Sequence, residues 1–167
     1  MKTTSYLFIV FSFFLFSVFS CRKDDIASND TPDNSAGLNE SLMLQLVNQQ
    51  RQQGCNCGTT YYPPTTTLTW NDQLEAAALF HASDMNENNY FNHTGLNGSS
   101  PGDRISNAGY NWKTYGENIA KGYTSEQSVM NGWIASEGHC KNIMNPNFRE
   151  FGAAKAGAYW VQEFGAK

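Results

Sequence analysis

The stretch from Phe151 to Phe164 reads FGAAKAGAYWVQEF and indicates the fold class. Small, β-branched and aromatic residues flank Ala156-Gly157, a pattern typical of two strands joined by a tight turn. We therefore predict a β-hairpin at this end of the chain. Because helical patterns occupy the residues before it, we expect an α+β domain in which helices cover an antiparallel sheet.

Four segments before this hairpin have helical patterns. Leucines spaced by four residues form an apolar face over 38–53, and the glycine at 54 ends that helix. The strongest pattern lies over 72–85, where an Asp-x-x-Glu capping box precedes apolar residues three and four apart. Shorter helices are predicted over 100–109 and 124–138, each opened by a capping residue and closed by glycine. Cys, Gly, Pro, Thr and Tyr dominate 54–67, which we predict to be a long ordered loop.

Composition excludes several classes of protein. The chain has 167 residues, which is too short for several large domains but long enough to bury a single core without a metal or disulfide framework. Eleven Lys and Arg against 15 Asp and Glu give a net charge of −4, and the body of the chain has no basic run. Because nucleic-acid binding requires a basic surface, nucleic acid is not an expected partner. We expect a monomer.

The first 20 residues predict export from the cell. The apolar stretch over 6–19 follows a short charged start and is too short to span about 30 Å of hydrocarbon comfortably, so residues 1–20 are interpreted as a signal peptide. An uncleaved membrane anchor is the alternative. Ser20-Cys21 at its end resembles a bacterial lipobox, in which Cys21 is acylated and anchors the protein in the lipid bilayer. The charged residues at 22–25 resemble a surface-export signal, which predicts an outer-membrane lipoprotein exposed at the cell surface.

Residues 21–37 are predicted to be a disordered tether. They are dominated by polar residues, Pro and Gly and contain one large aliphatic side chain, so they bury too little apolar surface to offset the entropy of ordering. One folded domain is then expected over 38–167.

The chain has three histidines as candidates for chemistry. His81 lies on the apolar stripe of the helix over 72–85 and is predicted to be a core residue with one hydrogen bond. His93 and His139 fall at or near helix boundaries, where side chains can face a cleft. They lack a local metal-binding spacing, so only the fold can bring them together.

Four ordered motifs carry a family resemblance: Tyr-Phe-Asn-His at 90–93, Gly-Glu-Asn-Ile-Ala at 116–120, Trp-x-x-Ser-x-Gly-His-x-x-Asn-Ile at 133–143, and Tyr-Trp-Val-Gln-x-Phe-Gly at 159–165. Their order and spacing resemble those of bacterial CAP (SCP) domains. These domains belong to the superfamily of cysteine-rich secretory proteins, antigen 5 and plant pathogenesis-related 1 proteins. The resemblance covers 38–164 and implies a three-layer α-β-α sandwich around a small antiparallel sheet.

The resemblance also implies a cleft with two histidines and two acids. By motif, His93 and His139 match the imidazoles and Glu117 matches one acid. The usual position of the second acid holds Ser136, so the candidate is Glu137, which comes one residue later and points about 100° further around a helix. Two imidazoles and a carboxylate suit Zn²⁺ or another divalent metal, with water completing the site. Alternatively, Glu117 hydrogen-bonds an imidazole and fixes the loops around the cleft.

The resemblance favours a ligand-binding module for lipid, sterol, glycan or peptide over an enzyme. The alternative is a metal-dependent or serine-type extracellular hydrolase, in which Ser136, His139 and Glu117 form a nucleophilic set. No Gly-x-Ser-x-Gly motif surrounds Ser136, which favours a capping role for this residue.

The remaining three cysteines predict one bridge and one thiol if Cys21 is acylated. Cys55 and Cys57 are too close in sequence to join each other without strain, so one of them is expected to pair with Cys140. Such a bridge would contribute about 3–5 kcal/mol. In the alternative, the three thiols bind zinc.

Overall fold

The computed structural model describes residue 1 and residues 37–167. The predicted signal peptide over 1–20, the acylation site Cys21 and the tether over 21–37 lie outside the described residues, except for their terminal residues Met1 and Gly37. Within the described part, no helix combines the length and apolarity needed to cross a membrane.

A four-stranded sheet forms the middle layer, in the order β3 (Thr69–Trp70), β5 (Glu150–Ala156), β6 (Tyr159–Ala166) and β4 (Thr114–Lys121). Strands β5 and β6 form the predicted C-terminal hairpin, and β6 also pairs antiparallel with β4. Gly157 has a φ of 56° in the hairpin turn, a left-handed conformation that glycine adopts without steric cost. The hairpin prediction is confirmed, and β4 is an edge strand of the sheet.

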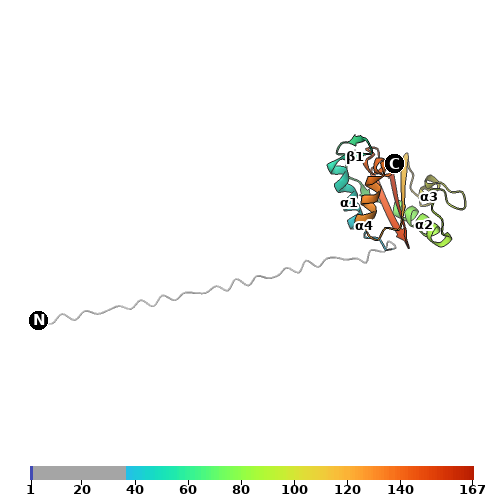
Figure 1. Ribbon diagram of the computed structural model, residues 1–167, viewed down its shortest axis with the longest axis horizontal. Helices are drawn as coiled ribbons and strands as arrows, with labels where there is room; N and C mark the ends of the chain where they lie inside the picture. The colour runs from blue at the N-terminus through green and yellow to red at the C-terminus, as the bar shows by residue number, and fades with distance from the viewer. Residues whose placement is uncertain (2–36) are drawn as a thin grey trace. The chain divides into compact units, whose positions relative to one another are not determined.

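Helices cover both faces of this sheet (Figure 1). On one face, α2 (Asp72–Asn88) packs on β5 and β6, with α3 (Pro101–Asn107) beside it. The other face is covered by α1 (Glu40–Gln53), α4 (Glu126–Ala135) and α5 (Glu137–Met144), listed here in chain order. The α+β class and the three-layer sandwich are therefore confirmed.

The alternation of β6 divides the core into two halves. Trp160 and Phe164 face α1, α4 and α5, where they pack with Trp133 in the larger apolar cluster. Tyr159 and Val161 face α2 and pack against its alanines in a smaller cluster. The next residue on the same face of β6 after Val161 is the buried Glu163, so a carboxyl group enters the interior on the α2 side.

Three local expectations were wrong. The segment predicted as a loop over 54–67 contains a hairpin of β1 (Cys55–Cys57) and β2 (Thr60–Tyr62), which pair only with each other. The helix predicted over 124–138 is two helices, because Ser136 has an extended backbone that separates α4 from α5. The helix predicted from Asp72 is capped one residue earlier, by the Asn71 side chain.

Candidate functional site

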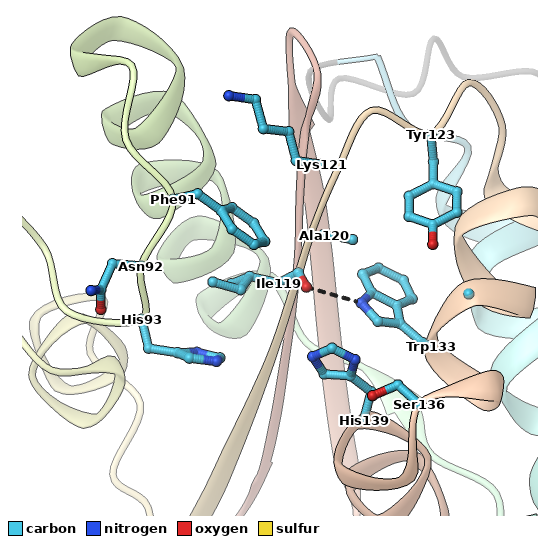
Figure 2. Close-up of a pocket in the computed structure, with 11 residues that line it drawn as sticks. Phe91, Asn92, His93, Ile119, Ala120, Lys121, Tyr123, Trp133, Ser136 and His139 are labelled. Carbon is cyan, nitrogen blue, oxygen red and sulfur yellow. Dashed lines mark hydrogen bonds between the residues drawn. The ribbon is translucent and has the colours of Figure 1, made fainter.

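A cleft of about 540 Å³ lies along β4. Segment 91–93, which follows α2, forms one wall, and α4 with the start of α5 forms the other (Figure 2). Because β4 is the edge strand of the sheet, no further strand covers its outer side. The lining residues are Phe91, Asn92, His93, Ile119, Ala120, Lys121, Tyr123, Gly132, Trp133, Ser136 and His139.

His93 reaches the cleft because the chain turns sharply after α2. Asn89 ends this helix with a left-handed φ of 50°. The Nε2–H of buried His81 then donates to the carbonyl of Asn92 at 2.9 Å, and Arg104 Nη2 donates to the carbonyl of His93 at 2.9 Å. These two bonds hold the segment in place while the His93 side chain stays 51 % exposed. The prediction of His81 as a core histidine with one hydrogen bond is confirmed.

His139 comes from the opposite wall. It lies in the first turns of α5, and its carbonyl accepts a hydrogen bond from Asn118 Nδ2 at 3.2 Å. The imidazoles of His93 and His139 face each other across the cleft (Figure 2). Burial lowers the pKa of His139, and the neighbouring His93 lowers it further. A neutral His139 imidazole is therefore favoured near neutral pH.

Glu117 lies behind His93 rather than in the cleft lining. Its carboxylate is 2 % exposed and accepts from His93 Nδ1 at 2.5 Å and from Arg104 Nη2 at 2.5 Å. Burial alone would raise the pKa of Glu117, but the His93 hydrogen bond and the Arg104 charge outweigh it and lower the pKa. Because the ionised Glu117 accepts a hydrogen bond from His93 Nδ1–H, the free lone pair of the His93 imidazole is on Nε2.

A second buried carboxyl group, Glu163, was missed at the level of sequence. It pairs with Glu117 in the register of β4 and β6, and its carboxyl group hydrogen-bonds the Glu117 carboxylate. Burial raises its pKa well above the ordinary value, and the charge of Glu117 raises it further, so Glu163 stays protonated. The available signal was the period-two alternation of residues 159–165, which places this position on the inner face with Val161.

An amide network ties α5 to the sheet. Asn118 Nδ2 also donates to Gln162 Oε1 at 3.1 Å, and Asn142 Nδ2 donates to Asn118 Oδ1 at 2.9 Å and to the carbonyl of Glu117 at 3.0 Å. Asn118 and Gln162 are fully buried. This network sets the position of α5, and with it His139, against β4.

The structure does not bring Glu137 into the cleft. Glu137 is the first residue of α5, and its carboxylate pairs with Lys141 at 2.5 Å on the exposed side of that helix. The same carboxylate lies against Gly58 of the β1–β2 turn. Glu137 is one position further along than the expected acid, so it points around the helix to the hairpin instead of to the cleft.

The residues of a serine hydrolase are not assembled here. Ser136 lines the cleft, but within the described residues no hydrogen bond joins it to His139. Glu117 contacts His93 and not His139, so the expected order of serine, base and orienting acid is broken.

For a metal, the cleft offers two imidazoles. His93 and His139 present ring nitrogens from opposite walls, while Glu117 is already engaged by His93 and Arg104. This arrangement fits two protein ligands with the other positions open to water or a bound molecule. Glu117 then acts as the carboxylate that orients a ligating imidazole, a common support for metal-binding histidines.

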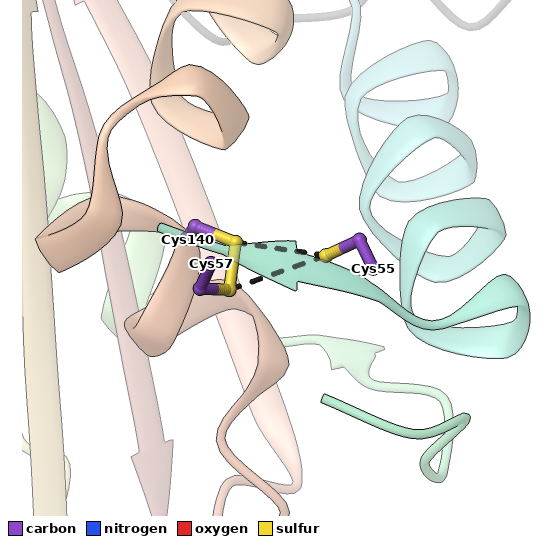
Figure 3. A group of neighbouring side chains, drawn as sticks. All are labelled: Cys55, Cys57 and Cys140. Atoms are coloured by element: carbon purple, nitrogen blue, oxygen red, sulfur yellow. Dashed lines mark hydrogen bonds between the residues drawn. A yellow bond between two sulfur atoms is a disulfide. The ribbon is translucent and has the colours of Figure 1, made fainter. Parts of the chain in front are cut away.

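The cysteines form a bridge away from the cleft lining. Cys57 and Cys140 are joined by a disulfide, which ties the β1–β2 hairpin to α5, and Cys55 remains a thiol (Figure 3). The three sulfurs are the only group of three or more candidate metal ligands among residues 37–167. With the bridge closed, one thiol remains, so the cluster in this state is not a three-thiolate zinc site.

Comparison with known proteins identifies the family. The CAP family, described as the cysteine-rich secretory protein family, matches residues 44–164. The uncharacterized protein YkwD of Bacillus subtilis is 36 % identical over 134 residues, which cover 78 % of this chain and 48 % of YkwD.

Solved structures share the fold. An extracellular protein containing an SCP domain from Bacillus anthracis superposes with a TM-score of 0.68 and 28 % identity, over 77 % of this chain and 40 % of that one. A structure described as NaASP2 with Zn²⁺ superposes with a TM-score of 0.56 and 18 % identity, over 80 % and 83 % of the two chains. The chain thus spans about half the length of YkwD and 40 % of the B. anthracis protein. From the family match, which covers most of its residues, the chain belongs to the CAP, or cysteine-rich secretory protein, family.

Proposed function

We propose that this protein is an exported module that binds an amphipathic ligand in the cleft along β4. The observation that carries the proposal is that His93 and His139 enter one open cleft from opposite walls, while aromatic residues line the same space. Clefts that combine broad apolar surface with a few oriented polar groups are the usual form of ligand sites.

The lining indicates the chemistry of the ligand. Phe91 and Tyr123 are 49 % and 37 % exposed, and Trp133 lies between Tyr123 and His139 (Figure 2). Trp133 is buried at the edge of the cleft, and its indole N–H donates to the Ile119 carbonyl at 3.4 Å, so it supports the lining and its N–H is not available to a ligand. A lipid, sterol, glycan or peptide with an apolar face and one polar group suits this lining.

A fluorescent fatty acid is a direct probe of this site. We expect it to bind the wild-type protein and to bind at least about tenfold more weakly to Phe91→Ala, because about 1.5–3 kcal/mol accompanies burial of such a side chain. The matched control is Phe80→Ala, which removes an equally exposed phenylalanine from α2 outside the cleft. Equal weakening in both variants, or none in either, would contradict the proposal. Sterol, glycan and peptide competitors then distinguish the ligand classes.

The two imidazoles are proposed to hold a divalent metal such as Zn²⁺. The metal would supply a Lewis acid that attracts the polar group of the ligand. Glu117 accepts a hydrogen bond from His93 Nδ1–H, and the amide network positions His139. Both imidazoles are therefore oriented before a metal binds. The structure described as NaASP2 with Zn²⁺ shows the same fold at 18 % identity, which makes zinc the first metal to test.

Calorimetric titration with zinc tests the metal proposal. The wild-type protein should take up one ion, and His93→Ala and His139→Ala should each lose that binding. Glu137→Ala is the control, because the structure places this acid on the far side of α5. If His139→Ala binds zinc as the wild type does, the two imidazoles are not the site.

Export and anchoring belong to the same proposal. The signal peptide over 1–20, the acylated Cys21 and the tether over 21–37 would present the CAP domain at the outer surface of a bacterium. The B. anthracis relative is described as an extracellular protein, which supports export. Radiolabelled palmitate should mark the wild-type protein, and label that persists in Cys21→Ala would refute the anchor.

A further inference from the structure

Two cysteines of one strand face a third on a helix. Cys55 and Cys57 are two residues apart in β1, so their side chains lie on the same side of that strand. Both sulfurs point to Cys140 of α5 (Figure 3). Cys140 is bonded to Cys57, while the thiol of Cys55 lies 3.5 Å from Cys140 Sγ and 4.0 Å from Cys57 Sγ.

The two cysteines of β1 differ in their exposure to solvent. Cys57 and Cys140 are fully buried, whereas Cys55 is half-buried and open to solvent on one side. The reactive thiol is thus the accessible member of the three, and the bridge beside it is shielded from outside reagents. A thiol held this close to a disulfide has a high effective concentration for attack on it.

We propose that these three cysteines form a disulfide-exchange site, in which the bridge moves between Cys57–Cys140 and Cys55–Cys140. Cys55 loses its proton to solvent, and its thiolate attacks Cys140 Sγ. The Cys55–Cys140 bond forms as the Cys57–Cys140 bond breaks, and Cys57 leaves as a thiolate that takes up a proton. No electron is gained or lost overall, so the step needs no external oxidant or reductant.

The geometry sets two conditions on this exchange. The distances from Cys55 to the two bridged sulfurs differ by only half an ångström, so the thiol lies beside the bridge and not in line with it. Attack therefore needs a rotation of the Cys55 side chain. Burial raises the pKa of the Cys55 thiol, an effect that the nearby Gln50 side chain partly offsets. The exchange is consequently slow near neutral pH and faster in mild alkali.

The exchange has a consequence for the cleft. Cys140 follows His139, and it is the shared partner in both forms of the bridge, so α5 stays tied to the hairpin in either form. What changes is the free thiol, which alternates between the half-buried position 55 and the fully buried position 57. Among the three described cysteines, the exchange thus moves the free thiol from a half-buried to a buried position while the cross-link behind His139 remains.

The test uses the full-length chain with Cys21→Ser, so that the three described cysteines are the only ones present. Oxidised protein is incubated at about pH 8.5 with a metal chelator, since this is close to the ordinary pKa of a cysteine thiol. Samples are quenched with acid and unfolded, and the free thiol is blocked with N-ethylmaleimide. Mass spectrometric fragmentation then shows whether the label is on Cys55 or on Cys57.

The label is expected on Cys55 at the start and on Cys57 in a growing and finally constant fraction, with one thiol per chain throughout. Cys57→Ser should form the Cys55–Cys140 bridge and show no free thiol, and Cys55→Ser, the matched control, should keep the original bridge. A label confined to Cys55 at every time would overturn the proposal. So would two free thiols in a Cys57→Ser protein with native circular dichroism; if this variant does not fold, the time course decides alone.

Discussion

Replacing Glu163 by glutamine should change the stability of the protein, relative to the wild type, by an amount that increases in favour of the variant as the pH rises. Glu163 is fully buried, and burial raises its pKa; the charge of Glu117 and a hydrogen bond to that carboxylate raise it further. The folded protein keeps this proton at a pH where the unfolded chain, with an ordinary pKa of 4.5, has lost it. The stability that the neutral carboxyl group contributes is therefore complete below pH 4.5 and falls as the pH rises toward the raised folded pKa.

The slope follows from proton linkage. With one extra proton bound in the folded state, stability falls by up to about 1.4 kcal/mol for each pH unit. Glutamine has nearly the same shape and no proton to lose, so its advantage over glutamate should increase at that rate. Any fixed cost of its amide shifts the variant's whole stability curve equally and leaves the slope unchanged.

Urea unfolding of wild-type and Glu163→Gln proteins at about pH 5, 6, 7 and 8 measures the difference. Glu87→Gln is the matched control, because it removes an exposed carboxyl group from α2 and should track the wild type. A Glu163→Gln advantage that is constant from pH 5 to pH 8 would refute the reasoning, since it would mean that Glu163 is ionised in the folded protein.

Three further substitutions test the packing. Arg104→Met should cost about 3–5 kcal/mol of unfolding free energy, because it removes the buried guanidinium that is paired with the buried Glu117 carboxylate. Lys141→Met, which breaks an exposed pair, should change the urea midpoint little. Gly152→Ala should cost about 3 kcal/mol or more, since its Cβ would lie 2.2 Å from a backbone nitrogen of α2, whereas Gly138→Ala meets no atom within 4 Å and should unfold nearly as the wild type does. Cys140→Ser should lower stability by about 3–5 kcal/mol under oxidising conditions, and a similar loss in fully reduced wild type would show that the bridge is responsible. Stability close to that of the oxidised wild-type protein in any of these three variants would contradict the corresponding contact.

The elements with strong local signals were predicted well. The apolar stripe over 72–85 became α2, and the Ser-Pro-Gly-Asp sequence at 100–103 became the capped start of α3, with both capping bonds present. The hairpin over 150–166 formed as expected around Gly157. In each case the deciding interactions join residues that are close to one another in the sequence.

Strand β4 shows why other elements could not be predicted. Its sequence, TYGENIAK, contains glycine, two polar residues and a lysine, which disfavour a strand, and its hydrogen bonds are made with β6, more than 35 residues away in sequence. The side chains of Glu117 and Asn118 are buried on opposite faces of this strand, where partners from α3, α5 and β6 satisfy them. No local pattern contains these partners.

The sequence by itself determined the class of fold, the family and the three residues at the cleft motifs: His93, Glu117 and His139. These follow from the periodicity of apolar residues and from short motifs, which are properties of neighbouring positions. Only the tertiary structure decided what each residue does. It placed Glu117 behind His93 as an orienting carboxylate, turned Glu137 away to Lys141, and added Arg104 and Glu163. The reason is physical: a buried charge is tolerated only beside a partner, and these partners lie on other helices and strands.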